Sequence, residues 1–445
     1  MTRANRDHVV CVGLTHVTGE ADSKTRLAEG QVTAFNVAVG AFSIFLAVIG
    51  IYYARRQFVD SARVAESQGK FRAERAALNN SRNPLALRAA AVHRRSDPTL
   101  RTLGPAGHLT RDDLIFRQPM SVAEVRLNWR DEASGNSSGV LEAGRGVLPL
   151  KSTRSRFLTY SDAMAEVCPP GIFENRLCYR LADVNMTGGA PVYTFTRASY
   201  FEMIDNAEAL GHEFHLACAR ESTPSWRRMP LRSQFCSDVL SLTERVVAPS
   251  IVTLTLIRRR QRPWSFLMHW RDPAEVGTSG NMTHVIPAGM FQPASAGAMA
   301  VRRDLDLWRN IMREMAEEML GIPEASGKAG DSIDYDNTEP YASLQKARAR
   351  GKISVWCFGI GVDPLTLTVE ILTAVVIDEN AFNKIFANLV SVNEEGIVIR
   401  RDGPVRNTLG IDFTEQSIQE YSAAYNLTPS AGACLQLAWT HRRCL

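Results

Sequence analysis

The sequence lacks the cysteine patterns that bind zinc or form a redox centre. Its eight cysteines include no C-x-x-C pair, and no group of cysteines and histidines has the spacing of a zinc site. Several cysteines, Cys357 and Cys434 among them, lie in apolar segments, as is typical of reduced and buried thiols. We therefore expect the folded part of the chain to lie in a reducing compartment.

The chain also lacks a strong net charge. It has 51 Lys and Arg residues and 47 Asp and Glu residues, which gives a formal net charge of +4. The excess of positive charge is local, because residues 54–118 alone carry 13 basic and 6 acidic residues. A nucleic-acid-binding surface is not indicated, and we expect no direct binding to nucleic acid. A length of 445 residues predicts two globular units with connecting segments.

Charged residues are absent from residues 30–54. The core of this run, VTAFNVAVGAFSIFLAVIGIYY, would span about 33 Å as a helix, enough to cross the hydrocarbon core of a bilayer. It ends in two tyrosines followed by Arg55 and Arg56, as is typical of a headgroup boundary. We predict a transmembrane helix at residues 31–54. A cleaved signal peptide and a buried helix are the alternatives, and the polar leader of residues 1–30 argues against the first.

The flanking charges predict an orientation for this span. More basic residues follow the apolar run than precede it, so the C-terminal domains are expected on the cytoplasmic side of a single-pass membrane protein. Asn36 and several alanines within the run permit helix–helix association. A homo-oligomer is therefore a further expectation.

The rest of the chain is predicted to form three segments. Residues 55–118 are expected to be a basic juxtamembrane helix and a linker, because X-Pro pairs interrupt their regularity. Residues 119–247 combine alternating strands with a long helical segment, which predicts an accessory α+β domain. That segment contains HEFH, but His212 and His215 are three positions apart, which does not match the spacing of a metalloprotease helix. Residues 248–445 predict a mixed sheet between helices.

One segment combines an apolar helix face with a cluster of glutamates. Residues 304–321 read DLDLWRNIMREMAEEMLG, and six of their apolar residues fall within roughly 120° of a helical wheel. Glu314, Glu317 and Glu318 share a neighbouring arc, since they stand at i, i+3 and i+4. Three clustered carboxylates suit a hard divalent cation, Mg²⁺ or Mn²⁺, so we predict them as metal ligands. The alternative is a surface helix with an Arg313–Glu317 ion pair.

The same residues resemble a diverged Nudix box. The loop IPAGMFQP precedes the helix, and REMAEE over residues 313–318 matches the family pattern R-E-(apolar)-x-E-E. Three features depart from that pattern. Leu305 stands where the family has a glutamate, one extra residue precedes Gly321, and the segment between loop and helix is longer. The resemblance continues over much of residues 120–443, to a group of bacterial Nudix-like proteins.

The resemblance implies a fold and a reaction. The implied fold for residues 248–445 is an α/β/α sandwich with a mixed sheet, so the whole chain is expected to be α+β. Nudix hydrolases cleave a diphosphate linked to a nucleoside or another group, with a divalent cation. By this resemblance Glu314, Glu317 and Glu318 would be catalytic and would bind the metal, while Arg313 and Gly289 would have structural roles.

Two functions follow from these patterns. The first is a membrane-anchored hydrolase that cleaves a nucleoside diphosphate derivative, with Glu370 as a further acid or base candidate. The second is a diverged domain that binds a nucleotide-type small molecule without turnover and acts through its membrane helix. The order of domains resembles the membrane-anchored Nudix effectors of bacterial cyclic-oligonucleotide anti-phage systems, which suits the second function.

Overall fold

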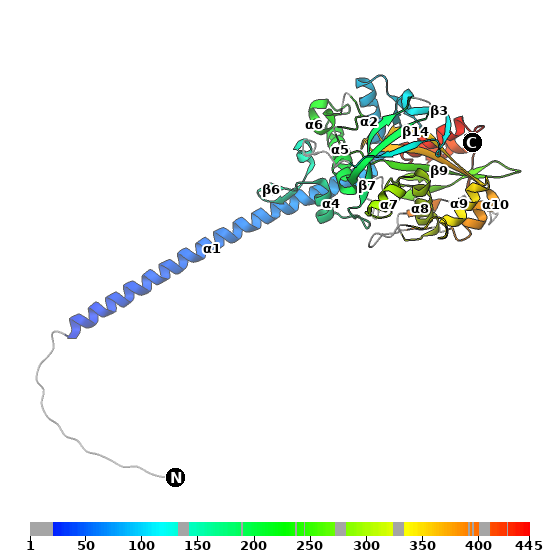
Figure 1. The fold of residues 1–445 in the computed structure, drawn as a ribbon. Coiled ribbons are helices and arrows are strands. Elements are labelled where there is room, and N and C mark those ends of the chain that lie inside the picture. Colours follow the sequence, from blue (N-terminus) through cyan, green and yellow to red (C-terminus); the bar gives the residue numbers. More distant parts are fainter. Residues whose placement is uncertain are drawn as a thin grey trace, which may run out of the picture. The chain divides into compact units, whose positions relative to one another are not determined.

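The chain combines a long apolar N-terminal helix with a mixed α and β fold, as expected (Figure 1). The computed structural model describes residues 21–131, 142–187, 190–235, 238–243, 245–271, 282–323, 333–389, 392–393, 396–399, 410–424 and 426–445. Its contacts separate two compact units, residues 1–65 and residues 66–445. Whether residues 119–247 and 248–445 are separate domains stays a prediction.

Helix α1 (Ala21–Asn80) contains the apolar run. Its most apolar 18-residue window has a mean hydropathy of 2.2 and is 0% buried. Phe35, Ile44 and Ile51 are all more than 60% exposed in this unit. An exposed apolar helix of this length is compatible with a membrane span and with a signal sequence.

The structure differs from the predicted linker at the end of residues 55–118. This part of the chain forms α2 (Arg82–Ser96), β1 (Arg101–Leu103), β2 (His108–Thr110), η1 (Asp112–Leu114) and β3 (Ile115–Ser121). Pro84 lies in the first turn of α2, where a proline leaves no helical hydrogen bond unmade. Leu85, Ala89 and Val92 bury one face of that helix. The proline therefore marks a helix start and not a linker.

A curled mixed sheet of nine strands forms the centre of residues 66–445. The strand order is β1-β2-β14-β15-β9-β10-β18, with β3 also paired to β14 and β13 to β9. Only the β9–β15 pairing is parallel. The strands not yet given are β9 (Ser250–Arg258), β10 (Ser265–Phe266), β13 (Ala288–Met290), β14 (Ile353–Val362), β15 (Val369–Asp378) and β18 (Ile411–Asp412).

Both faces of the central strands are buried. Ile251, Ile371 and their alternate neighbours join the apolar cluster that contains the methionines of α8, whereas Val252 and Leu372 join the cluster that contains α12. This alternation places α8 and α12 against opposite faces of the sheet. The helices after β13 are α7 (Ala298–Arg303), α8 (Leu307–Leu320), α9 (Tyr341–Ala349), α10 (Glu379–Ile385), α11 (Glu415–Ala424) and α12 (Pro429–Thr440).

Three smaller sheets accompany the large one. The order β4-β8-β7 makes β7 an edge strand, and β12-β11-β17-β16 and the hairpin β5-β6 form the other two. The bounds are β4 (Arg126–Trp129), β5 (Leu150–Ser152), β6 (Ser155–Arg156), β7 (Leu177–Asn185), β8 (Val192–Ser199), β11 (Met268–Arg271), β12 (Thr283–Val285), β16 (Val392–Asn393) and β17 (Gly396–Ile399). The remaining helices are η2 (Arg145–Val147), α4 (Tyr160–Val167), α5 (Tyr200–Arg220), η3 (Trp226–Arg228) and α6 (Pro230–Ser233).

Candidate functional site

Helix α8 carries the glutamates predicted as site residues. It begins after Asp306, whose side chain accepts a hydrogen bond from the Arg309 N–H at 2.9 Å and so caps the first turn. It ends at Gly321, which adopts a left-handed conformation at φ 63°. Trp308 and Met312 are buried on its apolar face. The helix predicted within residues 304–321 is confirmed, two or three residues shorter at its start.

Arg313 fixes α8 to the segments around it. Its guanidinium donates to the Tyr335 hydroxyl at 2.6 Å, to Asn310 Oδ1 at 2.9 Å and to the Gln292 carbonyl. Burial opposes the charged form, but Tyr335 and Asp304 outweigh it and raise the pKa of Arg313. The arginine is therefore a charged group held inside the protein, which suits the structural role that the resemblance implies.

Asp304 is a site residue that the sequence pattern did not assign. It is fully buried, accepts hydrogen bonds from the Tyr335 hydroxyl at 3.0 Å and the Ala294 N–H at 2.8 Å, and lies 3.6 Å from Arg313. Leu305 stands where the resemblance implies a glutamate, and the neighbouring Asp304 supplies a carboxylate to Arg313. The signal in the sequence was an acidic residue next to Leu305, the position at which a glutamate was expected.

Glu314 lies directly against Gly289. A Cβ atom at Gly289 would stand 2.1 Å from Glu314 Oε2 and 2.5 Å from Oε1. Gly289, which the resemblance gives a structural role, lies in β13 and is paired with Ile251. The glycine is needed here because only a residue without a side chain leaves room for the carboxylate.

Glu318 contacts the neighbouring residue of the same strand. Its Oε1 accepts a hydrogen bond from the Ala288 N–H at 3.2 Å, and its Oε2 lies 4.0 Å from Nδ1 of the buried His269. Glu317, between the two, is only half-buried. Two of the three predicted glutamates therefore reach the backbone of β13, and the third lies nearer the surface.

Two of the glutamates of α8 contact neighbouring residues of β13, Gly289 and Ala288. Carboxylates suit a hard cation, but in the part of the chain that the structure describes, no three His, Cys, Asp or Glu side chains lie together as metal ligands would. The binding of Mg²⁺ or Mn²⁺ stays a prediction.

Glu370 lies away from these glutamates. Ser430 of α12 donates to its Oε1 at 2.8 Å, and Nδ1 of His108 lies 3.2 Å from its Oε2, so the residue belongs to the α12 face of the sheet. Burial, with a smaller effect from Asp363, raises the pKa of Glu370 well above its usual value. Burial also lowers the pKa of His108 to about 3. Both pKa shifts favour the neutral forms of the two groups, which lie on the opposite face from α8.

The comparisons with known proteins place no family on the chain. No family model matches it, and no curated protein matches it significantly. The class that the structure defines is a mixed α and β protein with a long, exposed apolar helix. The Nudix-like relationship rests on residues 286–321 and their contacts, and stays a proposal.

Proposed function

We propose that residues 248–445 form a Nudix-like domain that binds a nucleotide-type ligand beside α8, in a chain that residues 31–54 anchor in a membrane. The observation that carries the proposal is the packing of α8 on β13 through Glu314 and Glu318. Together with the mixed sheet between α8 and α12, this strand–loop–helix unit supports the sandwich fold that the resemblance implies.

Binding without turnover is the function that this geometry favours. Glu318 accepts a backbone hydrogen bond and the Glu314 carboxylate fills the space above Gly289, so both carboxylates have roles in holding the protein together. Ligand binding would change the association of membrane helices between copies of the chain, with the domain on the cytoplasmic side.

Hydrolysis is the second candidate, and one contact favours it. Asp304 restores an acid partner for Arg313, so the replacement by Leu305 does not remove that part of the box. All three box glutamates are also present. The reaction would be cleavage of a diphosphate linkage in a nucleoside diphosphate derivative with Mg²⁺ or Mn²⁺.

One screen tests both candidates. The full-length protein in detergent is incubated with nucleoside diphosphate derivatives and with cyclic oligonucleotides, each with and without Mg²⁺. Thermal unfolding reports binding, and separation of the nucleotides reports turnover. We expect a rise in unfolding temperature for at least one ligand, with the ligand recovered intact.

One variant tests the box glutamates, and a second variant is its control. Replacing Glu317 and Glu318 by Gln removes two box charges, while Glu420→Gln removes an exposed charge on α11. Cleavage that the double variant loses and the control keeps would establish the hydrolase instead. If no ligand shifts unfolding and none is cleaved, the site assignment is wrong in both forms.

A further inference from the structure

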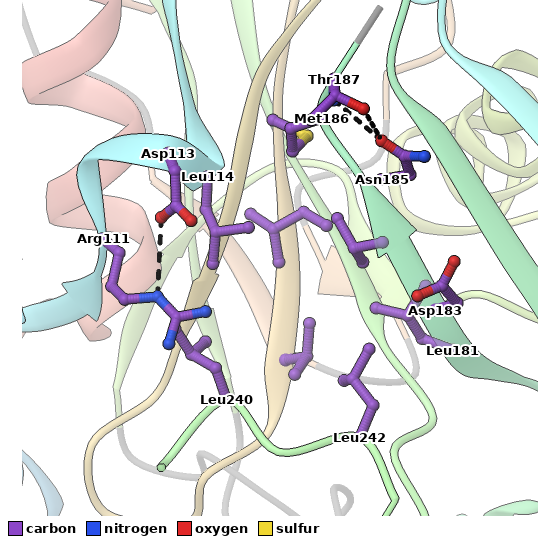
Figure 2. A pocket seen from close by; sticks show the side chains of 13 residues that line it. Arg111, Asp113, Leu114, Leu181, Asp183, Asn185, Met186, Thr187, Leu240 and Leu242 are labelled. Atoms are coloured by element: carbon purple, nitrogen blue, oxygen red, sulfur yellow. Dashed lines mark hydrogen bonds and ion pairs between the residues drawn. The ribbon is translucent and has the colours of Figure 1, made fainter.

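A cavity of about 600 Å³ lies outside the α8 site (Figure 2). It is bordered by η1, by the end of β7, by the segment around residues 240–242 and by the adjoining ends of β14 and β15. This volume is within the range of pockets that hold small organic molecules. The cavity therefore has the size of a ligand site, and nothing in the proposed function uses it.

The walls of the cavity are mostly aliphatic. Figure 2 shows leucines around its middle, and the apolar wall consists mainly of Leu114, Leu181, Leu240, Leu242, Ile360 and Val369. These side chains come from separate elements, among them β7, β14, β15 and η1. A ligand with an apolar body would displace water from this wall, which is favourable.

The rim of the cavity is acidic. Arg111 is its one lining cation, and it already lies 3.5 Å from both Asp113 and Asp238. Asp183 is exposed on the other side, and in the described part of the chain its side chain makes no hydrogen bond or ion pair. Among the described lining residues, two carboxylates, Asp113 and Asp183, thus face one guanidinium that is already paired. The rim attracts a positively charged group and repels a carboxylate or phosphate.

The edge of β7 adds hydrogen-bond acceptors to this rim. Residues 183–187 all line the cavity, so the strand borders it with its edge and not with one face. β7 is the edge strand of its sheet, and its outer edge is hydrogen-bonded to Phe291 and Val247 only through the N–H groups of Tyr179 and Leu181 among the bonds described. Carbonyl groups of an edge strand can accept hydrogen bonds from a ligand. An ammonium group can donate three hydrogen bonds, and such carbonyls and the Asp183 carboxylate can accept them.

We propose that this cavity binds a small organic cation, with an apolar body between the leucines and a protonated amine at Asp183. The proposal does not depend on the function proposed for α8. A diphosphate ligand would meet the acidic rim unfavourably, so the two sites differ in the charge of the ligand that they take.

Three probes with one apolar body test the charge of the ligand. Phenylbutylamine, phenylbutanol and phenylbutanoate are titrated into the full-length protein in detergent and followed by calorimetry. We expect the amine to bind about two- to fivefold more tightly than the alcohol, as befits a partly exposed ion pair, and the carboxylate to bind most weakly. Because detergent takes up all three probes, each affinity is compared between variants in the same detergent.

The variants assign the site. Asp183→Asn should lower amine affinity to that of the alcohol, whereas Asp162→Asn, an exposed aspartate on α4, should leave it unchanged. Leu242→Trp places an indole ring in the aliphatic part of the cavity and should weaken binding of all three probes. Thermal unfolding shows whether Leu242→Trp folds. If it does not, Thr187→Trp at the exposed rim is the second variant expected to weaken binding of all three probes.

The results separate support from refutation. A preference for the amine that Asp183→Asn removes supports the proposal. Equal affinity for all three probes would leave only an apolar cavity and overturn the assignment of Asp183. A preference for the carboxylate would make Arg111 the recognition group and overturn it as well. No binding by a folded protein would show that the cavity is not a ligand site.

Discussion

One buried cluster in the described part of residues 66–445 brings opposite charges together. Glu208 of α5 is fully buried, and Arg82 donates to both of its oxygens at 2.7 and 2.8 Å while Arg75 donates at 2.9 Å. Burial alone would raise the pKa of Glu208, but Arg82 and Arg75 lower it. The three residues join the end of α1 and the start of α2 to α5.

Replacing Glu208 by Gln should be strongly destabilising. Removing one member of a buried charge cluster leaves the others uncompensated, which costs about 3–5 kcal/mol. Urea unfolding at neutral pH measures the loss, and Glu420→Gln on the exposed face of α11 provides the matched control. The lowered pKa means that this contribution is present at neutral pH and lost as pH falls through the folded-state value. An unchanged midpoint would refute the cluster.

The contact between Gly289 and Glu314 predicts that the effects of substitutions at these two positions on stability are coupled. Gly289→Ala places a methyl group where the Glu314 carboxylate lies, so the carboxylate must move within a buried site. We expect a loss of about 1–3 kcal/mol, the range for overpacking. In a Glu314→Ala background the same change should cost almost nothing. Equal losses in both backgrounds would mean that strain in β13, and not the carboxylate, is responsible.

The secondary-structure elements show where the sequence was informative. Helix α8 could be predicted because periodicity, an N-capping aspartate and a terminal glycine agree over one continuous segment. β2 and β3 could not, because they are short and pair with β14, whose residues lie more than 200 positions later. The apolar cavity was missed for the same reason, since its walls come from separate elements. Asp304 was missed because only the fold shows which of two flanking acids reaches Arg313.

The Glu370–His108 pair joins β15 to β2 and, through Ser430, to α12. With the pKa of Glu370 raised, the folded state holds a proton that the unfolded chain releases above pH of about 4.5. Stability at this site therefore falls as pH rises, by about 1.4 kcal/mol per unit, until the folded-state pKa is reached. Holding this carboxyl in its protonated form therefore lowers the stability of the folded state at pH 7.

Glu370→Gln should remove that cost. The amide is neutral at every pH, can accept from Ser430 and can donate to Nδ1 of His108. We expect the variant to match the parent near pH 4.5 and to be more stable at pH 7, with a difference that grows with pH. Urea unfolding at both values measures it. A variant that is less stable at pH 7 would show that Glu370 is ionised and that its charge is needed.

At the scale of the whole molecule, the apolar part of α1 makes a prediction about the cellular location of the protein. Among the described residues of its own unit, no protein surface covers the window that is 0% buried, and so large an apolar surface is unfavourable in water. A bilayer can surround this apolar surface. The helix can enter the bilayer because every backbone group of a helix is hydrogen-bonded within the helix. A signal peptidase would remove it instead, and the two outcomes differ in the mass of the mature chain.

Fractionation of cells that express the full chain separates these outcomes. We expect the protein in the membrane pellet after carbonate extraction, with its N-terminal segment retained in the mass spectrum. A chain that begins at Glu66, the start of the second compact unit, should be found in the supernatant. Replacing Phe42 and Leu46 by Lys should release the full chain as well, since each lysine at the centre of a span costs about 2.5–3.5 kcal/mol. Replacing the exposed Arg94 and Arg95 of α2 by Lys provides the control and should leave it in the pellet. A chain shortened at its N-terminus would identify α1 as the source of a signal sequence, and a soluble full-length chain would exclude both.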